Sequence, residues 1–146
     1  MGLRKLVGTG VLLGSVLLLG CSPVDIGAAT GAGKRFHDQF NQQNYAAIYQ
    51  EADPKFREAV QQDALTKLLT KVHDKLGNVT DTTRTGFNVN YNVGGSTVTI
   101  TYSTKFQQGE GQERFVWLKS DDGVRLLNYD IRSDALTELD KRSNTQ

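Results

Sequence analysis

The chain has 146 residues, 38% of them hydrophobic, which suffices for one domain with a single core. Its 17 basic and 16 acidic residues give a net charge of +1, so no excess of positive charge indicates nucleic acid as a partner. A single cysteine and two histidines exclude an internal disulfide and a cysteine-rich metal site. We expect no metal and no cofactor.

The first 20 residues have the pattern of an export signal. Arg4 and Lys5 precede an uncharged run, residues 6–20, that is rich in leucine, valine and glycine. A membrane-spanning helix needs about 20 apolar residues, and this run is shorter. Residues 1–20 are therefore predicted to be a signal peptide.

The only cysteine, Cys21, directly follows this run in the sequence LLGC. This motif resembles a bacterial lipobox, which implies cleavage after Gly20, a diacylglycerol on the Cys21 sulfur and acylation of the new amino group. Multiple acyl chains make a lasting anchor, so the membrane is the first expected partner. The residue after the cysteine is Ser22, whereas an aspartate at this position would resemble an inner-membrane retention signal. We therefore expect the outer membrane of the cell envelope, facing the periplasm; the alternative is a cleaved export signal with an incidental free cysteine.

Residues 21–33 are predicted to be the lipidated cysteine and a flexible tether, because SPVDIGAATGAG is rich in small residues and has no sustained apolar period. The end of this stretch, GAATGAGK, does not match a phosphate-binding loop. Ala28 stands where that motif needs glycine, and Arg35 where it needs serine or threonine. The folded domain is predicted to span residues 34–132.

The first part of the domain has a helical period. Phe36 and Phe40 stand four apart, and residues 41–44 (NQQN) interrupt the helix. Asp53 is predicted to cap a short helix that has Pro54 at its first position and runs through Val60.

A longer helix is predicted to begin at Asp63 as its N-cap and to end at Gly77. Its apolar residues recur at helical spacing and predict one buried face: Leu65, Leu68, Leu69, Val72 and Leu76.

After Gly77 the period changes to two, which predicts strands. A hairpin with one dry face turns at residues 94–95 and has these apolar residues: Phe87, Val89, Tyr91, Val93, Val98, Ile100, Tyr102 and Phe106. Turns at residues 109–111 and 122–123 complete four antiparallel strands. Adjacent apolar residues in the last two strands predict a sheet that is covered on both sides or bent. Residues 133–146 are predicted to be a polar tail with a short helix.

Helices followed by a strand meander predict an α+β domain, with the helices on one face of a curved four-stranded antiparallel sheet. The order from QQNYAAIYQEADPKF through a leucine-striped helix to DDGVRLLNYDI resembles a family of small exported bacterial proteins of unknown function. That family has the cone-shaped fold of nuclear transport factor 2 and the cystatin-like group. The resemblance carries over no catalytic residue, and such a fold does not by itself assign a function.

A cone of this kind can hold a pocket, and the candidate pocket residues are Tyr91, Tyr102, Trp117, Tyr129 and Asp130. The alternative is that the aromatic residues among them are ordinary core residues, because the alternation of apolar residues along the strands already explains their positions. His37 is expected at a wet edge, and His73 beside the leucine face of the long helix.

Two functions remain open from the sequence. The first is a non-catalytic envelope lipoprotein that binds a protein or peptide through its sheet or cone mouth. The second is a small-molecule or lipid carrier, or a weak enzyme, that uses the cone as a pocket. A filled cone with an exposed apolar patch favours the first, and a lined cavity favours the second. The absence of a catalytic constellation in the sequence favours the non-enzymatic function.

The lipid anchor gives the first testable prediction. Replacing Cys21 with serine should abolish incorporation of a palmitate analogue in growing cells, because oxygen cannot form the thioether. The precursor should then remain uncleaved or be released as soluble protein. An absence of label in the unaltered chain would contradict the lipobox interpretation.

Overall fold

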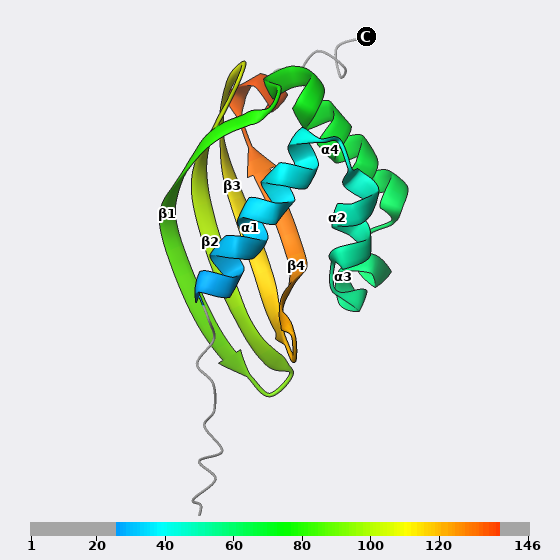
Figure 1. The fold of residues 1–146 in the computed structure, drawn as a ribbon, viewed down its shortest axis with the longest axis vertical. Helices are drawn as coiled ribbons and strands as arrows, with labels where there is room; N and C mark the ends of the chain where they lie inside the picture. Colours follow the sequence, from blue (N-terminus) through cyan, green and yellow to red (C-terminus); the bar gives the residue numbers. More distant parts are fainter. Residues whose placement is uncertain (1–25, 138–146) are drawn as a thin grey trace, which may run out of the picture.

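The computed structural model describes residues 26–137, and these form four helices followed by a four-stranded sheet (Figure 1). The helices are α1 (Ile26–Asn41), α2 (Tyr45–Glu51), α3 (Pro54–Ala59) and α4 (Gln62–Leu76). The strands are β1 (Val79–Asn92), β2 (Gly95–Phe106), β3 (Gly109–Ser120) and β4 (Gly123–Arg132). The predicted signal peptide, Cys21 and residues 138–146 lie outside the described residues.

The predicted α+β architecture is confirmed. All neighbouring strands are antiparallel, in the order β1-β2-β3-β4, and the helices lie together on the concave face of the curved sheet (Figure 1). A register shift between Val116 and Trp117 bends β3 against β4, as the adjacent apolar residues predict. The turn between β2 and β3 lies at residues 107–108, two residues before the predicted position.

Capping chemistry determines the start of α3 and the end of α4, but not the start of α4. The Asp53 carboxylate accepts a hydrogen bond from the Lys55 N–H at 2.9 Å, and Pro54 occupies the first turn, as predicted. The predicted Asp63 cap is wrong: Gln61 is the N-cap, and Asp63 lies inside the first turn. There its negative charge still interacts favourably with the positive end of the helix dipole. Gly77 ends α4 with a φ of 74°, which a glycine adopts without strain.

The predicted tether is wrong for residues 26–33, because α1 begins at Ile26. Ala29 and Ala32 are buried and continue the helical spacing of Phe36 and Phe40. The small residues here serve close packing: a Cβ on Gly33 would lie 3.3 Å from the Tyr102 hydroxyl. Small residues that suggest flexibility in the sequence therefore let α1 approach the sheet.

One core fills the space between the helices and the sheet. Phe36 of α1 packs against Phe115 and Tyr129 with ring centroids 5.0 Å and 4.8 Å apart. From α4, four of the five predicted apolar residues are buried, but the prediction is wrong for Leu68, which is 37% exposed because it lies at the edge of the buried face. The backbone N–H of Asp53 donates to the carbonyl of Leu126 at 2.9 Å, which ties the link between α2 and α3 to β4.

The predicted dry face of the first hairpin is only half correct. The β2 residues Val98 and Ile100 are buried, but Phe87 and Tyr91 of β1 are exposed, as is Val93 in the turn. Phe87 pairs with Ile100, so the two side chains share one face of the sheet. The β1 residues are exposed because the helices do not extend over this part of the face (Figure 1).

The helix face predicts the effect of a core substitution. Leu69 is 0% exposed, so Leu69→Ala should lower the free energy of unfolding by about 2 to 5 kcal/mol, as other large-to-small core changes do. Urea denaturation of residues 22–146 would measure it. Lys67→Ala on the exposed face of the same helix is the control, and equal effects from both changes would contradict the packing of α4.

Candidate functional site

The most unusual group in the interior is the carboxylate of Glu113 on β3, which is 1% exposed. One oxygen, Oε2, accepts hydrogen bonds from His37 Nε2 at 2.7 Å and from Thr104 Oγ1 at 2.5 Å. The other, Oε1, accepts from the Tyr129 hydroxyl at 2.7 Å. A buried carboxylate is costly unless it is well hydrogen bonded, and here three donors surround it.

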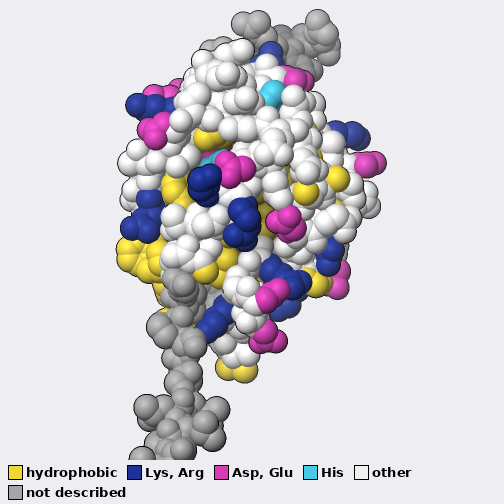
Figure 2. Space-filling view, viewed as in Figure 1, with side chains coloured by type: hydrophobic (Ala, Val, Ile, Leu, Met, Phe, Trp, Pro, Cys, Tyr) yellow, Lys and Arg dark blue, Asp and Glu magenta, His cyan; other side chains and the backbone are white. Residues whose placement is uncertain are grey.

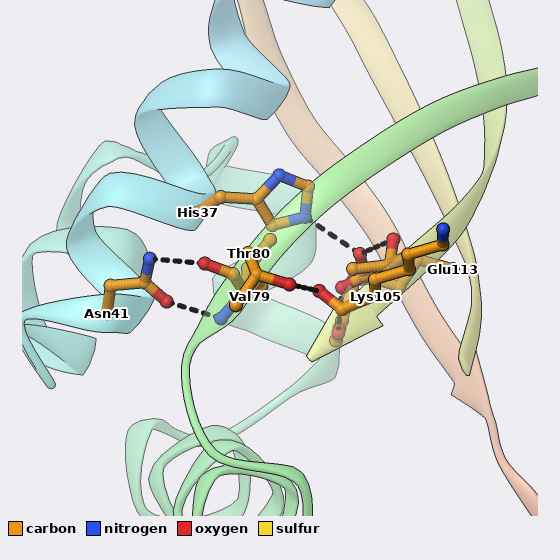
Figure 3. Close-up of polar contacts among 8 residues, drawn as sticks. His37, Asn41, Val79, Thr80, Lys105 and Glu113 are labelled. Atoms are coloured by element: carbon orange, nitrogen blue, oxygen red, sulfur yellow. Dashed lines mark hydrogen bonds and ion pairs between the residues drawn. The ribbon is translucent and has the colours of Figure 1, made fainter. Parts of the chain in front are cut away.

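Four elements supply this Glu113 cluster, which consists of Glu113, His37, Thr104 and Tyr129. Glu113 precedes Phe115 by two residues, so the pleat of β3 points it to the same inner face. Thr104 and Tyr129 come from β2 and β4, which pair with β3 on either side. His37 lies beside Phe36 on the buried stripe of α1, and Figure 3 shows its ring directed toward Glu113.

The environment sets the charge of the cluster. Burial raises the pKa of the Glu113 carboxyl, but the hydrogen bonds from His37, Thr104 and Tyr129 outweigh burial and hold that pKa below its ordinary value. Burial also raises the pKa of the Tyr129 phenol, and the adjacent Glu113 charge raises it further. Glu113 is thus ionised at neutral pH, while Tyr129 keeps its proton and donates it.

A groove of about 710 Å³ opens between α1 and β1. His37 and Tyr102 link it to the interior, since both line the groove and both are buried among core residues. Most of the other lining side chains are polar or charged: Thr30, Lys34, Asp38, Asn41, Thr80, Asp81, Thr82 and Arg84. The groove therefore suits a ligand with several polar groups.

Asn41 closes one end of this groove. Its side-chain amide donates to the carbonyl of Val79 at 3.0 Å and accepts from the Val79 N–H at 2.8 Å (Figure 3). The amide thereby satisfies both backbone groups of Val79, as a neighbouring strand would do. At the base of the groove, Tyr102 packs against Gly33, and burial raises the pKa of its phenol.

The structure does not bring the five candidate pocket residues into one cavity. Tyr102 lines the groove and Tyr129 belongs to the Glu113 cluster. Trp117 stacks on Phe115 and borders a separate cavity of only about 50 Å³. Asp130 lies 3.4 Å from Arg114 on the other face of the sheet, because strand residues alternate, and Tyr91 is exposed.

The expectation that His37 lies at a wet edge is wrong, because the ring is buried against Glu113. His73 is partly buried, and its Nε2 lies 2.8 Å from the side-chain oxygen of Asn78. A signal for the cluster does exist in the sequence. Glu113 shares the inward phase of Phe115 and Trp117, and His37 falls on the stripe that contains Phe36 and Phe40.

The described residues place further limits on the chemistry. Within residues 26–137, no three His, Cys, Asp or Glu side chains lie close enough together to hold a metal ion. In the same range, no helix has the length and apolar character needed to cross a membrane. Within the cluster, Glu113 fixes the orientation of the His37 ring, which donates a hydrogen bond to it and also lines the floor of the open groove.

Comparison with known protein families gives a match over most of the described domain. Residues 32–129 match the protein family described as "Protein of unknown function (DUF4019)". No curated protein matches the chain. The matched region extends from the middle of α1 to Tyr129, and so it includes every member of the Glu113 cluster.

The cluster predicts a specific dependence of stability on pH. Glu113→Gln should lower the free energy of unfolding at neutral pH by roughly 3 to 5 kcal/mol, because three donors lose their charged acceptor. Because the folded state holds the Glu113 pKa below its ordinary value, this stabilisation is present above about pH 4.5 and is lost as the pH falls further. The difference between the variant and the unaltered chain should therefore shrink in acid.

Urea denaturation across a pH series would measure this difference. Glu110→Gln is the matched control, since Glu110 lies on the same strand but is exposed. Parallel pH profiles for Glu113→Gln and the unaltered chain would contradict an ionised Glu113.

Proposed function

The chain belongs to the DUF4019 family, and on that premise we propose that it is a lipid-anchored protein of the bacterial cell envelope whose domain binds an extended segment of another protein. The anchor is the lipid on Cys21, which holds the domain at the outer membrane on its periplasmic side. The domain is non-catalytic and takes the cystatin-like, nuclear transport factor 2-like cone. Four helices on the concave face of a curved antiparallel sheet support this fold.

The observation that carries the binding proposal is the free edge of β1 beside the groove. Among the described strands, β1 pairs only with β2, so its other edge offers unpaired backbone groups (Figure 1). Long edge strands are usually protected by proline, lysine or β-bulges. The 14 residues of β1 contain no proline or lysine, and they carry only two charges, Asp81 and Arg84. Two register shifts interrupt β1 near residues 80 and 85, and the stretches 81–84 and 86–92 between and after them pair regularly with β2.

An extended peptide can add to such an edge as a further strand. The backbone then supplies the affinity, and neighbouring pockets select side chains. The Asn41 side-chain amide already bonds the N–H and carbonyl of Val79 as a neighbouring strand would. The first half of β1 is therefore oriented to form backbone hydrogen bonds with a partner on this side. Polar side chains of the bound segment would lie in the groove between α1 and residues 79–84 of β1.

A filled interior supports a protein partner over a small molecule inside the cone. Phe115 lies at the centre of the core and contacts the rings of Phe36, Tyr102, Trp117 and Tyr129. The Glu113 oxygens are also occupied by internal donors. A carboxylate held in this way organises His37 and is not free to act on a substrate.

The second candidate is a small polar ligand in the same groove, and the groove volume of about 710 Å³ favours it. His37 and Tyr102 would be the recognition groups at its floor. Native mass spectrometry of protein isolated from its own membranes distinguishes this case, since a carrier would retain a small ligand.

Site-specific crosslinking in cells tests the binding proposal. A photoreactive amino acid at Thr82, in the groove, should give a protein adduct that maps to one extended segment of the partner. The same amino acid at Thr70, an exposed threonine on α4, should not give that adduct. Identical adducts from both positions, or none from Thr82, would count against the β1 edge as a binding site.

A further inference from the structure

Exposed apolar residues mark the tip of the first hairpin. Tyr91 is 67% exposed and Val93 111%, and we call these two residues the hairpin patch. Phe87, which is 57% exposed, lies about 20 Å before Val93 at 3.4 Å per residue and is outside the patch. Tyr91 shares the strand phase of Phe87, which pairs with the buried Ile100, so the patch continues the inner face of the sheet outward from the core. Exposed apolar clusters of this kind usually mark a contact with another surface.

The patch is uncovered because the hairpin extends further than α1. Gly33 of α1 packs on Tyr102 of β2, which fixes the two elements against each other. From Tyr102 to the hairpin turn is about 24 Å at 3.4 Å per strand residue. From Gly33 back to Ile26 is about 10 Å at 1.5 Å per helical residue. The tip of the hairpin therefore extends roughly 14 Å beyond the start of the helix.

The same end of the molecule carries the chain toward Cys21. In Figure 1 the N-terminal end of α1 points toward the tip of the hairpin between β1 and β2, and the C-terminal end of the domain lies opposite. Figure 2 shows apolar side chains at this lower end of the molecule. Cys21 precedes Ile26 by five residues, which span at most about 17 Å. Cys21 and the hairpin tip can therefore reach the same plane.

We propose that the hairpin patch inserts into the interfacial layer of the membrane that holds the Cys21 lipid, and so forms a second membrane contact. This inference rests on the lipid anchor of the proposed function. Tyrosine and other amphipathic aromatic residues favour the boundary between headgroups and acyl chains.

The charges at this end identify the kind of lipid surface. The turn between β3 and β4 lies at the same end (Figure 1), and it carries Asp121 and Asp122. Asp122 pairs with Arg125 at 3.1 Å, and Lys119, two residues before Asp121 on β3, offsets the negative charge of Asp121. Electrostatic attraction to anionic lipid is therefore not the driving force. Burial of the hairpin patch is the driving force, so zwitterionic phosphatidylcholine vesicles suffice as a probe.

Two contacts would orient the domain, whereas one flexible anchor would not. With the hairpin tip in the interface, the strands rise away from the membrane. Thr82 lies eleven residues along the chain from Val93, or about 37 Å at 3.4 Å per residue. The groove and the first half of β1 would then face the periplasm, where a protein partner can approach.

Tryptophan fluorescence of the lipidated mature chain in vesicles tests the inference. Tyr91→Trp places a reporter in the patch, and Gln108→Trp places one in the exposed turn at the opposite end of the sheet. With dibrominated phosphatidylcholine, the Tyr91→Trp emission should be quenched at least twofold more than the Gln108→Trp emission. The native Trp117 is buried, and the unaltered chain measures its contribution.

Each other outcome overturns the inference in a distinguishable way. Equal quenching of the two reporters in labelled, vesicle-bound protein removes the second contact but leaves the lipid anchor intact. A blue-shifted Tyr91→Trp emission without bromine quenching indicates a second copy of the chain on the patch instead of lipid. A chain that takes up no palmitate analogue and does not stay with vesicles overturns both the anchor and the inference.

Discussion

The arrangement of this domain depends on one buried carboxylate. Glu113 lies between two strands and beneath α1, and it accepts hydrogen bonds from His37, Thr104 and Tyr129. An ionised carboxylate loses much hydration free energy on burial, so its position is stable only where all three donors are in place. Only one placement of α1 brings His37 to Glu113. The cluster thus fixes how the helix lies on the sheet, which apolar packing alone specifies less sharply.

The placement of α1 in turn determines the external surfaces. At one end, the Asn41 amide bonds the backbone of Val79 and holds the helix against β1. Beyond that contact, the helix and the strand diverge and leave the polar groove, with His37 and Tyr102 at its floor. At the other end, α1 stops short of the hairpin tip and leaves Tyr91 uncovered. The groove and the apolar patch are both consequences of where one helix lies.

Much of the fold follows from local sequence. Asp53 and Pro54 determine where α3 begins, Gly77 determines where α4 ends, and the change of period after Gly77 separates helices from strands. The two wrong predictions for the helical half, the Asp63 cap and the tether at residues 26–33, also have local causes. Asp63 was a plausible cap, but α4 begins one residue before it, at Gln62. The small residues at 26–33 have a composition typical of a tether, yet Ala29 and Ala32 lie at the spacing of a buried stripe.

The candidate site was less accessible from the sequence, because its members come from distant segments. The sequence by itself determined the order of elements, the inward phase of each strand and the prediction of a lipid on Cys21. Only the tertiary structure decided that His37 and Glu113, 76 positions apart, meet in the core, and that Asp130 faces away from it. Periodicity reports which face of an element is apolar. Whether that face is covered depends on where a helix from another part of the chain lies, and this is why Ile100 is buried while Phe87, its partner across the hairpin, is exposed.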